Sequence, residues 1–267
     1  MAVIGGSGFY EFLDDPTTVE VSTPHGDPSA PIAVGDVGGR PVAFLPRHGK
    51  RHEFPPHKIN YRANIWALAS LGVQQILAPC AVGGLQPETQ PATLVVPDQL
   101  VDRTMSRVQT FIDTGAAHAP FADPYCPDLR AAMVDAAGDG VIDGGTMVVI
   151  EGPRFSTRAE SQSYARSGWT VVNMTGHPEA VLARELGLCY ATIALVTDLD
   201  AGVSKEESVD QAQVFALFEK HIGRLKGLLA EVVAGLDGVG DCGCASWLDD
   251  VTLPFELPGP GVSSPAR

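Results

Sequence analysis

The sequence predicts an α/β protein: a single domain with a central mixed, mostly parallel, twisted β-sheet flanked by helices. Apolar stretches of β type alternate with segments of helical periodicity along most of the chain, which is the pattern of strands joined by crossover helices. Many of these stretches are continuously apolar, as expected for strands covered on both faces. No internal repeat and no linker interrupts the series before its last helix ends.

The expected elements follow in chain order. Strands are predicted at residues 2–6, 31–37, 41–47, 74–84, 94–102, 146–153, 169–175 and 189–198. Helices are predicted at 64–72, 127–139, 178–188 and 208–236. Pro127 and Asp128 suit a first helical turn, and Ser208 or Asp210 suits an N-cap. We therefore expect one domain over residues 1–236 and a peripheral Gly- and Pro-rich tail over residues 237–267.

Composition narrows the classes of function. The 267 residues include 32 acidic and 18 basic ones, a formal net charge of −14, whereas nucleic-acid and anionic-membrane binding call for a basic face. No apolar run reaches the ~18 residues that a membrane span needs. The start, MAVIGGSGFY, lacks the basic region and long apolar core of a signal peptide. We expect a cytoplasmic protein that binds neither nucleic acid nor membrane.

The cysteines do not form the pattern of a secreted disulfide framework, being few and unevenly spaced. They are Cys80, Cys126, Cys189, Cys242 and Cys244. Cys80 and Cys189 lie in apolar stretches and are interpreted as small core residues. For Cys242 and Cys244 the sequence favours two free thiols in a solvated tail over a strained local disulfide.

Polar or glycine-rich residues occur at the ends of five predicted strands. Ligands of open α/β sheets bind at the carboxyl ends of the strands, so this recurrence predicts a binding site there. The five segments are Gly5-Gly6-Ser7-Gly8, Arg47-His48, Cys80-Ala81-Val82-Gly83-Gly84, Asn173-Met174-Thr175 and Thr197-Asp198.

Two of these segments suit an anion. Glycines around Ser7 let backbone amides point at an anion, and the hydroxyl adds a donor; a plain tight turn is the alternative. Glu11 and Phe9 stand where a dinucleotide fingerprint and a nucleophile elbow need glycine, so both motifs fail. Arg47 offers a planar fork for phosphate oxygens and His48 a further donor; a solvated basic loop is the alternative.

A metal site is disfavoured in the same segment. His48, His52 and His57 have no regular spacing and no neighbouring cysteine or paired acid. Phosphate binding is therefore the preferred interpretation.

Aromatic and acidic residues suit a heterocycle. Phe155 and Ser156 lie on a predicted turn after a buried strand, where a ring can stack on a flat base; a core Phe is the alternative. Asp198 and Asp200 follow the last strand, and in a closed pocket burial and mutual repulsion raise the pKa of at least one of them. A protonated carboxyl can donate to a ring nitrogen, and an ionised one accepts from an exocyclic amine. An N-cap and a solvated acid are the alternative.

Together, five segments in order resemble the trimeric purine nucleoside phosphorylases, and most of all the members that act on 5′-methylthioadenosine. The segments are IGGSGFY, RHGKRHEFPPHKINYRANIWAL, IEGPRFSTRAE, VNMTGHPEAVLARELGLCYA and TDLDAG. The resemblance runs from the first strand to about residue 235. It implies a nucleoside phosphorylase fold with a catalytic domain over residues 1–236. It also implies reversible phosphorolysis, in which phosphate attacks the anomeric carbon of the ribose and the purine leaves.

The resemblance also assigns roles residue by residue. It implies a phosphate site made of Ser7, Arg47, His48, the Ala81 amide and Thr175. It implies Met174 against the ribose, Phe155 stacked on the base with Ser156 nearby, Asp198 donating to N7 and Asp200 accepting from the 6-amino group. No metal or organic cofactor is implied.

The resemblance implies a homotrimer as well, in which His118 reaches the 5′ pocket of the neighbouring subunit. Two positions depart from the family's pattern. Cys80 stands where the methylthioadenosine enzymes often have a phosphate-binding threonine, and Gln211 replaces an apolar residue of the 5′ pocket beside Val214 and Phe215. A polar group there can admit a 5′-hydroxyl, which weakens the case for methylthioadenosine as the only substrate and leaves adenosine open.

Three alternatives stay open. A 6-oxopurine (inosine/guanosine) phosphorylase usually carries Asn at the first of the paired acids, where this chain has Asp198. A hydrolytic nucleosidase would not need the set of Ser7, Arg47, His48 and Thr175. A non-catalytic nucleoside-binding protein would be expected to lose Asp198 or the Arg-His pair.

Overall fold

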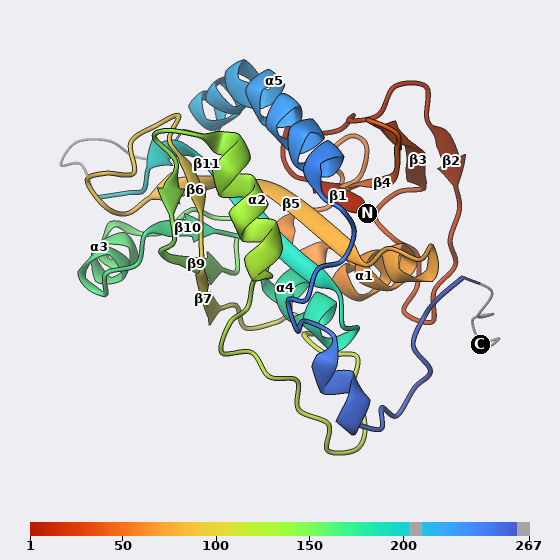
Figure 1. Ribbon diagram of the computed structural model, residues 1–267. Helices are drawn as coiled ribbons and strands as arrows, with labels where there is room; N and C mark the ends of the chain where they lie inside the picture. Colours follow the sequence, from red (N-terminus) through yellow and green to blue (C-terminus); the bar gives the residue numbers. More distant parts are fainter. Residues whose placement is uncertain (203–209, 261–267) are drawn as a thin grey trace.

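The computed structural model describes residues 1–202 and 210–260, and its centre is an eleven-stranded mixed sheet (Figure 1). The main path runs in the order β2 (Thr17–Val19), β3 (Ile32–Val37), β4 (Arg40–Pro46), β1 (Ala2–Gly5), β5 (Gln75–Gly84), β10 (Val171–Asn173), β9 (Thr146–Ile150) and β7 (Gln99–Arg103). A branch leaves β5 through β11 (Cys189–Leu199), β6 (Leu94–Val96) and β8 (Ile142–Asp143). Six of the ten pairings among the described strands are parallel. The predicted mixed, mostly parallel sheet is confirmed.

Strand β5 is the centre of the sheet. It pairs in parallel with β1 and β11, and its last residues pair antiparallel with β10. β1 also runs parallel to β4. The carboxyl ends of β1, β4, β5 and β11 therefore meet at one edge, as the sequence predicted for its polar strand ends.

Helices cover both faces of the sheet (Figure 1). One face carries α1 (Tyr61–Ser70) and α4 (Gly176–Glu185), and the other carries α2 (Pro127–Ala137) and α5 (Gln211–Gly235). Because successive side chains of a strand face opposite sides, Ile4 packs beneath α1 and α4 while Val3 packs beneath α2 and α5. No helix in residues 1–202 or 210–260 combines the length and apolar character of a membrane span.

The structure divides one of the predicted strands and adds one α-helix to those predicted. The strand expected at 94–102 is two strands, because the chain changes partners at Pro97, which cannot donate to a ladder: β6 pairs with β11 and β8, and β7 pairs with β9. The helix α3 (Arg158–Arg166) was not predicted, since it is polar and only Ser161 is buried. Its start carries a capping box, in which Thr157 and Glu160 exchange side chain to backbone hydrogen bonds.

The starts of the long helices agree with the expected caps. Pro127 and Asp128 occupy the first turn of α2. Asp210 is the N-cap of α5, and its side chain accepts from the Ala212 amide at 2.8 Å. The other predicted cap, Ser208, lies outside the described residues.

The tail, described over residues 237–260, lies against the domain and includes the short 3-10 helix η2 (Ser246–Asp250) (Figure 1). Within η2, Trp247 donates from Nε1 to the carbonyl of Arg184 in α4 at 2.9 Å. Gln75 at the start of β5 donates from Nε2 to the carbonyl of Gly238 at 3.0 Å.

The expectation of solvated tail thiols is wrong for Cys244. This side chain is buried beside Cys126 and Cys189 in the core layer beneath α2 and α5, and Cys242 packs against the same layer. Gly243 has a φ of 70°, which a side chain would strain. The turn at this glycine brings both neighbouring thiols to the domain, where a small apolar group such as a thiol packs well.

Candidate active site

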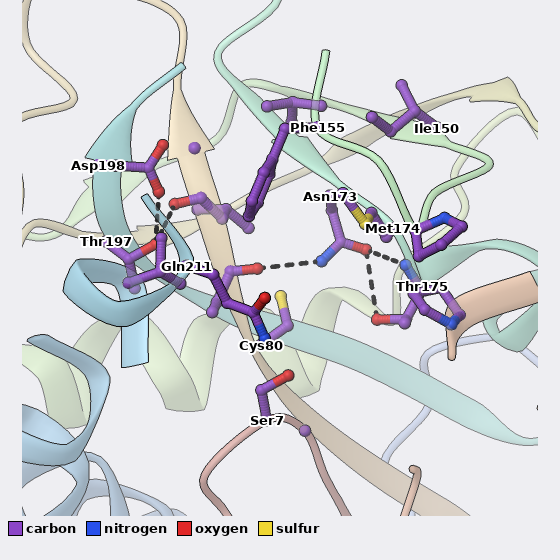
Figure 2. Close-up of a pocket in the computed structure, with 18 of the residues that line it drawn as sticks. Ser7, Cys80, Ile150, Phe155, Asn173, Met174, Thr175, Thr197, Asp198 and Gln211 are labelled. Carbon is purple, nitrogen blue, oxygen red and sulfur yellow. Dashed lines mark hydrogen bonds between the residues drawn. The ribbon is translucent and has the colours of Figure 1, made fainter. Parts of the chain in front are cut away.

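A cavity of about 360 Å³ opens where β1, β4, β5 and β11 end (Figure 2), a size that suits a small ligand. It gathers twelve of the thirteen predicted site residues. These are Ser7, Arg47, His48, Ala81, Phe155, Ser156, Met174, Thr175, Asp198, Asp200, Gln211 and Val214. The thirteenth, His118, is not one of the lining residues and is exposed on the segment before α2.

One wall of the cavity is built by the turn between β10 and α4. Asn173 Oδ1 accepts from the amides of Thr175 at 2.7 Å and Gly176 at 2.6 Å, while Asn173 Nδ2 donates to the Ala81 carbonyl at 3.3 Å. The two amides are therefore occupied, and what Thr175 offers a ligand is its hydroxyl. Its contact with Asn173 is long, at 3.5 Å.

Arg47 is buried behind this wall in an ion pair with Glu179 of α4. Nε donates to Oε1 at 2.5 Å and Nη2 to Oε2 at 2.9 Å, and the Tyr190 hydroxyl also donates to Oε2 at 2.9 Å. Burial alone lowers the pKa of Arg47, but the charge and hydrogen bonds of Glu179 outweigh it, and the pKa lies above its ordinary value. The guanidinium is thus charged, with Nη1 its nitrogen not bonded to Glu179. A Cβ on Gly6, which lines the cavity, would lie 2.9 Å from Nη1.

His48 is neutral in this environment. Its Nδ1 lies 2.8 Å from the Phe54 carbonyl; because a carbonyl only accepts, Nδ1 carries the proton and Nε2 keeps a lone pair. Its ring stacks on His52 with centroids 4.2 Å apart. Burial, followed by the positive charges of Arg47 and His52, lowers the pKa of His48 to about 3 against an opposing hydrogen bond to Phe54.

The opposite wall is shaped by an irregularity in β11. Val196 pairs with Val82, and Asp198 pairs with the next residue of β5, Gly83, so that Thr197 has no partner in the ladder. Such a bulge bends a strand and re-aims its side chains. Because of the bulge, the side chain of Asp198 faces the cavity. Without it, the regular alternation of side chains would continue as in the buried part of the strand.

Both acids have raised pKa values. Burial raises the pKa of Asp198 to about 6; the hydrogen bond from Thr197 at 2.8 Å opposes the shift, and the charge of Asp200 adds to it. Burial also raises the pKa of Asp200, against hydrogen bonds of which the first is from Ser161 Oγ at 2.5 Å. Asp198 is therefore partly protonated near neutral pH, while Asp200 has a hydroxyl donor that favours its role as acceptor.

Aromatic and apolar side chains close the remaining sides. Phe155, on the loop between β9 and α3, is 36% exposed at the rim. Figure 2 shows it above the cavity, with Asp198 on the left and Thr175 on the right. Gln211, Val214 and Phe215 come from the first five residues of α5.

The arrangement defines a class of protein. Hydroxyl, imidazole and guanidinium groups at one wall suit a phosphate-like anion, and a proton donor faces them across a space bordered by an aromatic ring. This is the geometry of an enzyme that transfers a glycosyl group from a base to an anion. The sequence matches the profile of the Phosphorylase superfamily over residues 1–234, and the chain belongs to that superfamily.

Individual relatives show which members of the superfamily this chain resembles. The S-methyl-5′-thioadenosine phosphorylase of Mycolicibacterium smegmatis is 58% identical over 97% of this chain and 99% of its own. The purine nucleoside phosphorylase of Streptomyces coelicolor is 54% identical over 97% of both chains. Among solved structures, methylthioadenosine phosphorylase from Schistosoma mansoni in complex with adenine has a TM-score of 0.87 at 38% identity, covering 92% of this chain and 94% of that one. The predicted family and fold are confirmed.

Three residues that organise the site had no role assigned to them from the sequence. Asn173 was named as part of a polar strand end but was given no role; it ends β10 two residues before the N-cap of α4 and is a residue type that accepts from helix-start amides, so its role had a local signal. Glu179 and Ser161 had none, because their partners Arg47 and Asp200 are 132 and 39 residues away in the chain.

Proposed function

We propose that the protein cleaves 5′-methylthioadenosine with inorganic phosphate, producing adenine and 5-methylthioribose-1-phosphate. The observation that carries this proposal is that Asp198 and Thr175 face one cavity from opposite walls (Figure 2). A nucleoside between them would have its base beside the acid and its sugar beside the anion. The similarity to methylthioadenosine phosphorylases supports the choice of substrate.

The reaction follows from the two walls. Phosphate, held by Ser7, His48 and Thr175 and by the charge of Arg47, attacks the anomeric carbon of the ribose from one side. A carbon–oxygen bond forms as the glycosidic carbon–nitrogen bond breaks, and the bonding electrons pass into the purine. The carboxyl of Asp198 gives its proton to N7, which neutralises the charge that the leaving base acquires.

The base is recognised as a 6-aminopurine. Asp200, held by Ser161 as an acceptor, would receive a hydrogen bond from the exocyclic amine. Phe155 would stack on the ring, which explains why a large apolar side chain is left exposed at the rim. Inorganic phosphate is a co-substrate, and the reaction needs no cofactor.

The 5′ end of the cavity supports adenosine as a second substrate. Val214 and Phe215 offer apolar surface to a methylthio group, whereas Gln211 beside them can hydrogen-bond a 5′-hydroxyl. Both groups occur at the start of α5.

One assay tests the proposal: release of free purine from methylthioadenosine, adenosine and inosine, each with and without phosphate. We expect adenine from methylthioadenosine, a lower rate with adenosine, little release from inosine and no release without phosphate. Dominant turnover of inosine would point instead to a 6-oxopurine phosphorylase. Phosphate-independent release would point to a nucleosidase, and tight binding without turnover to a nucleoside sensor.

The active form proposed here is a cytoplasmic homotrimer in which His118 of each subunit completes a neighbouring 5′ pocket. His118 is exposed and lies outside its own cavity. Met105 is 88% exposed on the segment that follows β7, and its amide donates to Glu151 next to the end of β9 at 2.7 Å. An apolar side chain this exposed would gain from being covered in a subunit contact. Light scattering should give the mass of three chains, and a monomeric active enzyme would contradict the shared pocket.

A further inference from the structure

Four of the five cysteines meet at one point, away from the cavity. Their Sγ atoms all lie within 4.8 Å of one another. They come from three parts of the chain: Cys126 is the N-cap of α2, Cys189 is the first residue of β11, and Cys242 and Cys244 lie in the tail. The turn at Gly243, with its positive φ, allows two cysteines of the sequence Cys-Gly-Cys to face the same centre.

The spacing of the sulfurs fits a common central ion. A tetrahedral zinc site with bonds of about 2.3 Å places its sulfurs about 3.8 Å apart, and here Cys189 and Cys242 lie at 3.3 Å with every other pair inside 4.8 Å. Disulfides would join sulfurs in separate pairs. Mutual proximity of all four is the arrangement that a single four-coordinate ion requires.

The surroundings support a metal over four protonated thiols. Cys126, Cys189 and Cys244 are only 1%, 2% and 3% exposed, within an apolar layer that includes Leu129 of α2. A thiol is a weak hydrogen-bond donor, so thiol–thiol contacts contribute little there. Cys242 is partly exposed and leaves the ion a path of entry.

We propose that Cys126, Cys189, Cys242 and Cys244 bind one structural Zn²⁺ as a closed tetrathiolate site. Four thiolates and no open position are the donor set of structural zinc, and soft sulfur ligands select zinc over magnesium or calcium. Cys126 is the N-cap of α2, so the positive end of the helix dipole would face the zinc tetrathiolate, which carries a net negative charge.

The ion would fasten the tail to the domain. It would tie residues 242–244 to α2 and β11, next to the hydrogen bonds that Gly238 and Trp247 already make with β5 and α4. Asp198 lies nine positions after Cys189 in β11, about 30 Å along a strand. The zinc would therefore act on stability and take no part in the reaction.

The sequence predicted no metal site. The histidines after β4 lacked the spacing of metal ligands, and Cys242 and Cys244 were expected to lie in solvent. A Cys-x-Cys pair is also tighter than the usual spacing of zinc ligands. Only the fold brings Cys126 and Cys189 to that pair. In a reducing cytoplasm, clustered cysteines are more often metal ligands than disulfides.

The test begins with the metal content of the full-length protein, purified from zinc-supplemented cells without chelators. We expect one zinc per chain by elemental mass spectrometry. The variants C126S and C244S should lose it, whereas C80S, which changes the cysteine outside the cluster, should retain it. The melting temperature should fall when zinc is removed from the wild type and rise again when zinc is returned.

A second measurement does not depend on how the variants fold. Reduced, metal-free wild-type protein titrated with Co²⁺ should bind one equivalent and show the thiolate-to-cobalt charge-transfer and visible bands of a tetrahedral tetrathiolate. Failure to bind zinc and cobalt would overturn the proposal, as would bands without thiolate character. Disulfides among these cysteines in the native protein, or iron in place of zinc, would overturn it too.

Discussion

Glu179 holds Arg47 in a two-point ion pair inside the protein, with nitrogen–oxygen distances of 2.5 and 2.9 Å. The pair connects the end of β4 to α4 and so joins two of the elements that form the wall where we propose that phosphate binds, called the anion wall. Because the pair uses Nε and Nη2, Arg47 can act on phosphate through its charge and through Nη1. A side-on fork on phosphate through Nε and Nη2 would require Arg47 to leave Glu179, whereas the outer N–H groups of Nη1 and Nη2, which make only 3.5 Å contacts with the carbonyls of Pro79 and Ile4, keep an end-on fork.

Replacing Glu179 with Gln should destabilise the protein by about 3–5 kcal/mol, since it keeps the shape of the side chain but leaves Arg47 as an uncompensated buried charge. Chemical and thermal denaturation measure the loss. The matched control is Asp113→Asn, which breaks the exposed pair with Arg62 at 3.0 Å and should cost at most about 1 kcal/mol. Equal losses of unfolding free energy in the two variants would mean that the buried pair stabilises the protein no more than the exposed one.

The pH dependence of the reaction should depend on Asp198. Its pKa is raised to about 6, so the protonated acid is abundant below that pH and its fraction falls as the pH rises further. We expect kcat/KM for the nucleoside to fall about tenfold per pH unit above that value. The rate ratio of wild type to Asp198→Asn removes the titration of phosphate itself and should show the same decline.

The Asp198→Asn variant also distinguishes the contribution of the acid to the rate from the contribution of the anion wall to phosphate binding. Loss of one positioned donor commonly costs about 3 kcal/mol of barrier, roughly a hundredfold in rate. We expect that loss in kcat with little change in the KM for phosphate. Normal turnover in this variant, measured as adenine release, would remove Asp198 from its role.

His48 should bind phosphate as a neutral acceptor. Its Nδ1–H donates to Phe54 and its pKa is lowered to about 3, so Nε2 can accept the proton of monohydrogen phosphate at neutral pH. His48→Phe removes that bond to a charged group, worth about 1.5–3 kcal/mol, and should raise the KM for phosphate at least tenfold. The KM for the nucleoside should change little; an equal rise in both would argue for a structural effect.

Much of this site could be predicted because its residues follow strand ends directly. Ser7, Arg47 and Asp198 closely follow buried strands that run parallel, and a parallel sheet brings such ends to one edge. Thr175 follows β10, which runs antiparallel to β5 and reaches the same edge by pairing with the last residues of β5. The apolar runs also located the main strands. What identified the chemistry was the joint occurrence of five motifs, because each motif alone had an equally good structural explanation.

Long-range pairing could not be predicted. The partner of Arg47 lies 132 residues away, and the cysteine cluster joins residues that the sequence placed separately in the core and in solvent. The bulge at Thr197 depends on how β11 pairs with β5, which strand periodicity does not report. These features arise only when the sheet assembles, so local patterns carry no record of them.

The choice between substrates should respond to Gln211. A hydrogen bond between its amide and a 5′-hydroxyl is worth about 1 kcal/mol, roughly fivefold in affinity. Gln211→Leu should lower kcat/KM for adenosine by about that factor relative to methylthioadenosine. An unchanged ratio of the two kcat/KM values would place the 5′ group elsewhere.

Gly83 separates the two acids, and filling its space should displace them. A Cβ there would lie 3.2 Å from Asp200 Cβ, 3.3 Å from Asp198 Oδ1 and 3.0 Å from Val172 Cγ1. The strand cannot easily shift to relieve these contacts, because β5 is paired on both sides at this point. We expect Gly83→Ala to lower kcat at least tenfold, since small misplacements of catalytic groups are costly.

Gly227 provides the matched control for that substitution. It lies on the exposed side of α5, and a Cβ there would meet nothing within 4 Å. Gly227→Ala should leave kcat unchanged and raise stability by up to about 1 kcal/mol through helix propensity. If Gly83→Ala were as active as Gly227→Ala, the acids would tolerate displacement, and a proton delivered from a fixed position would no longer explain the reaction.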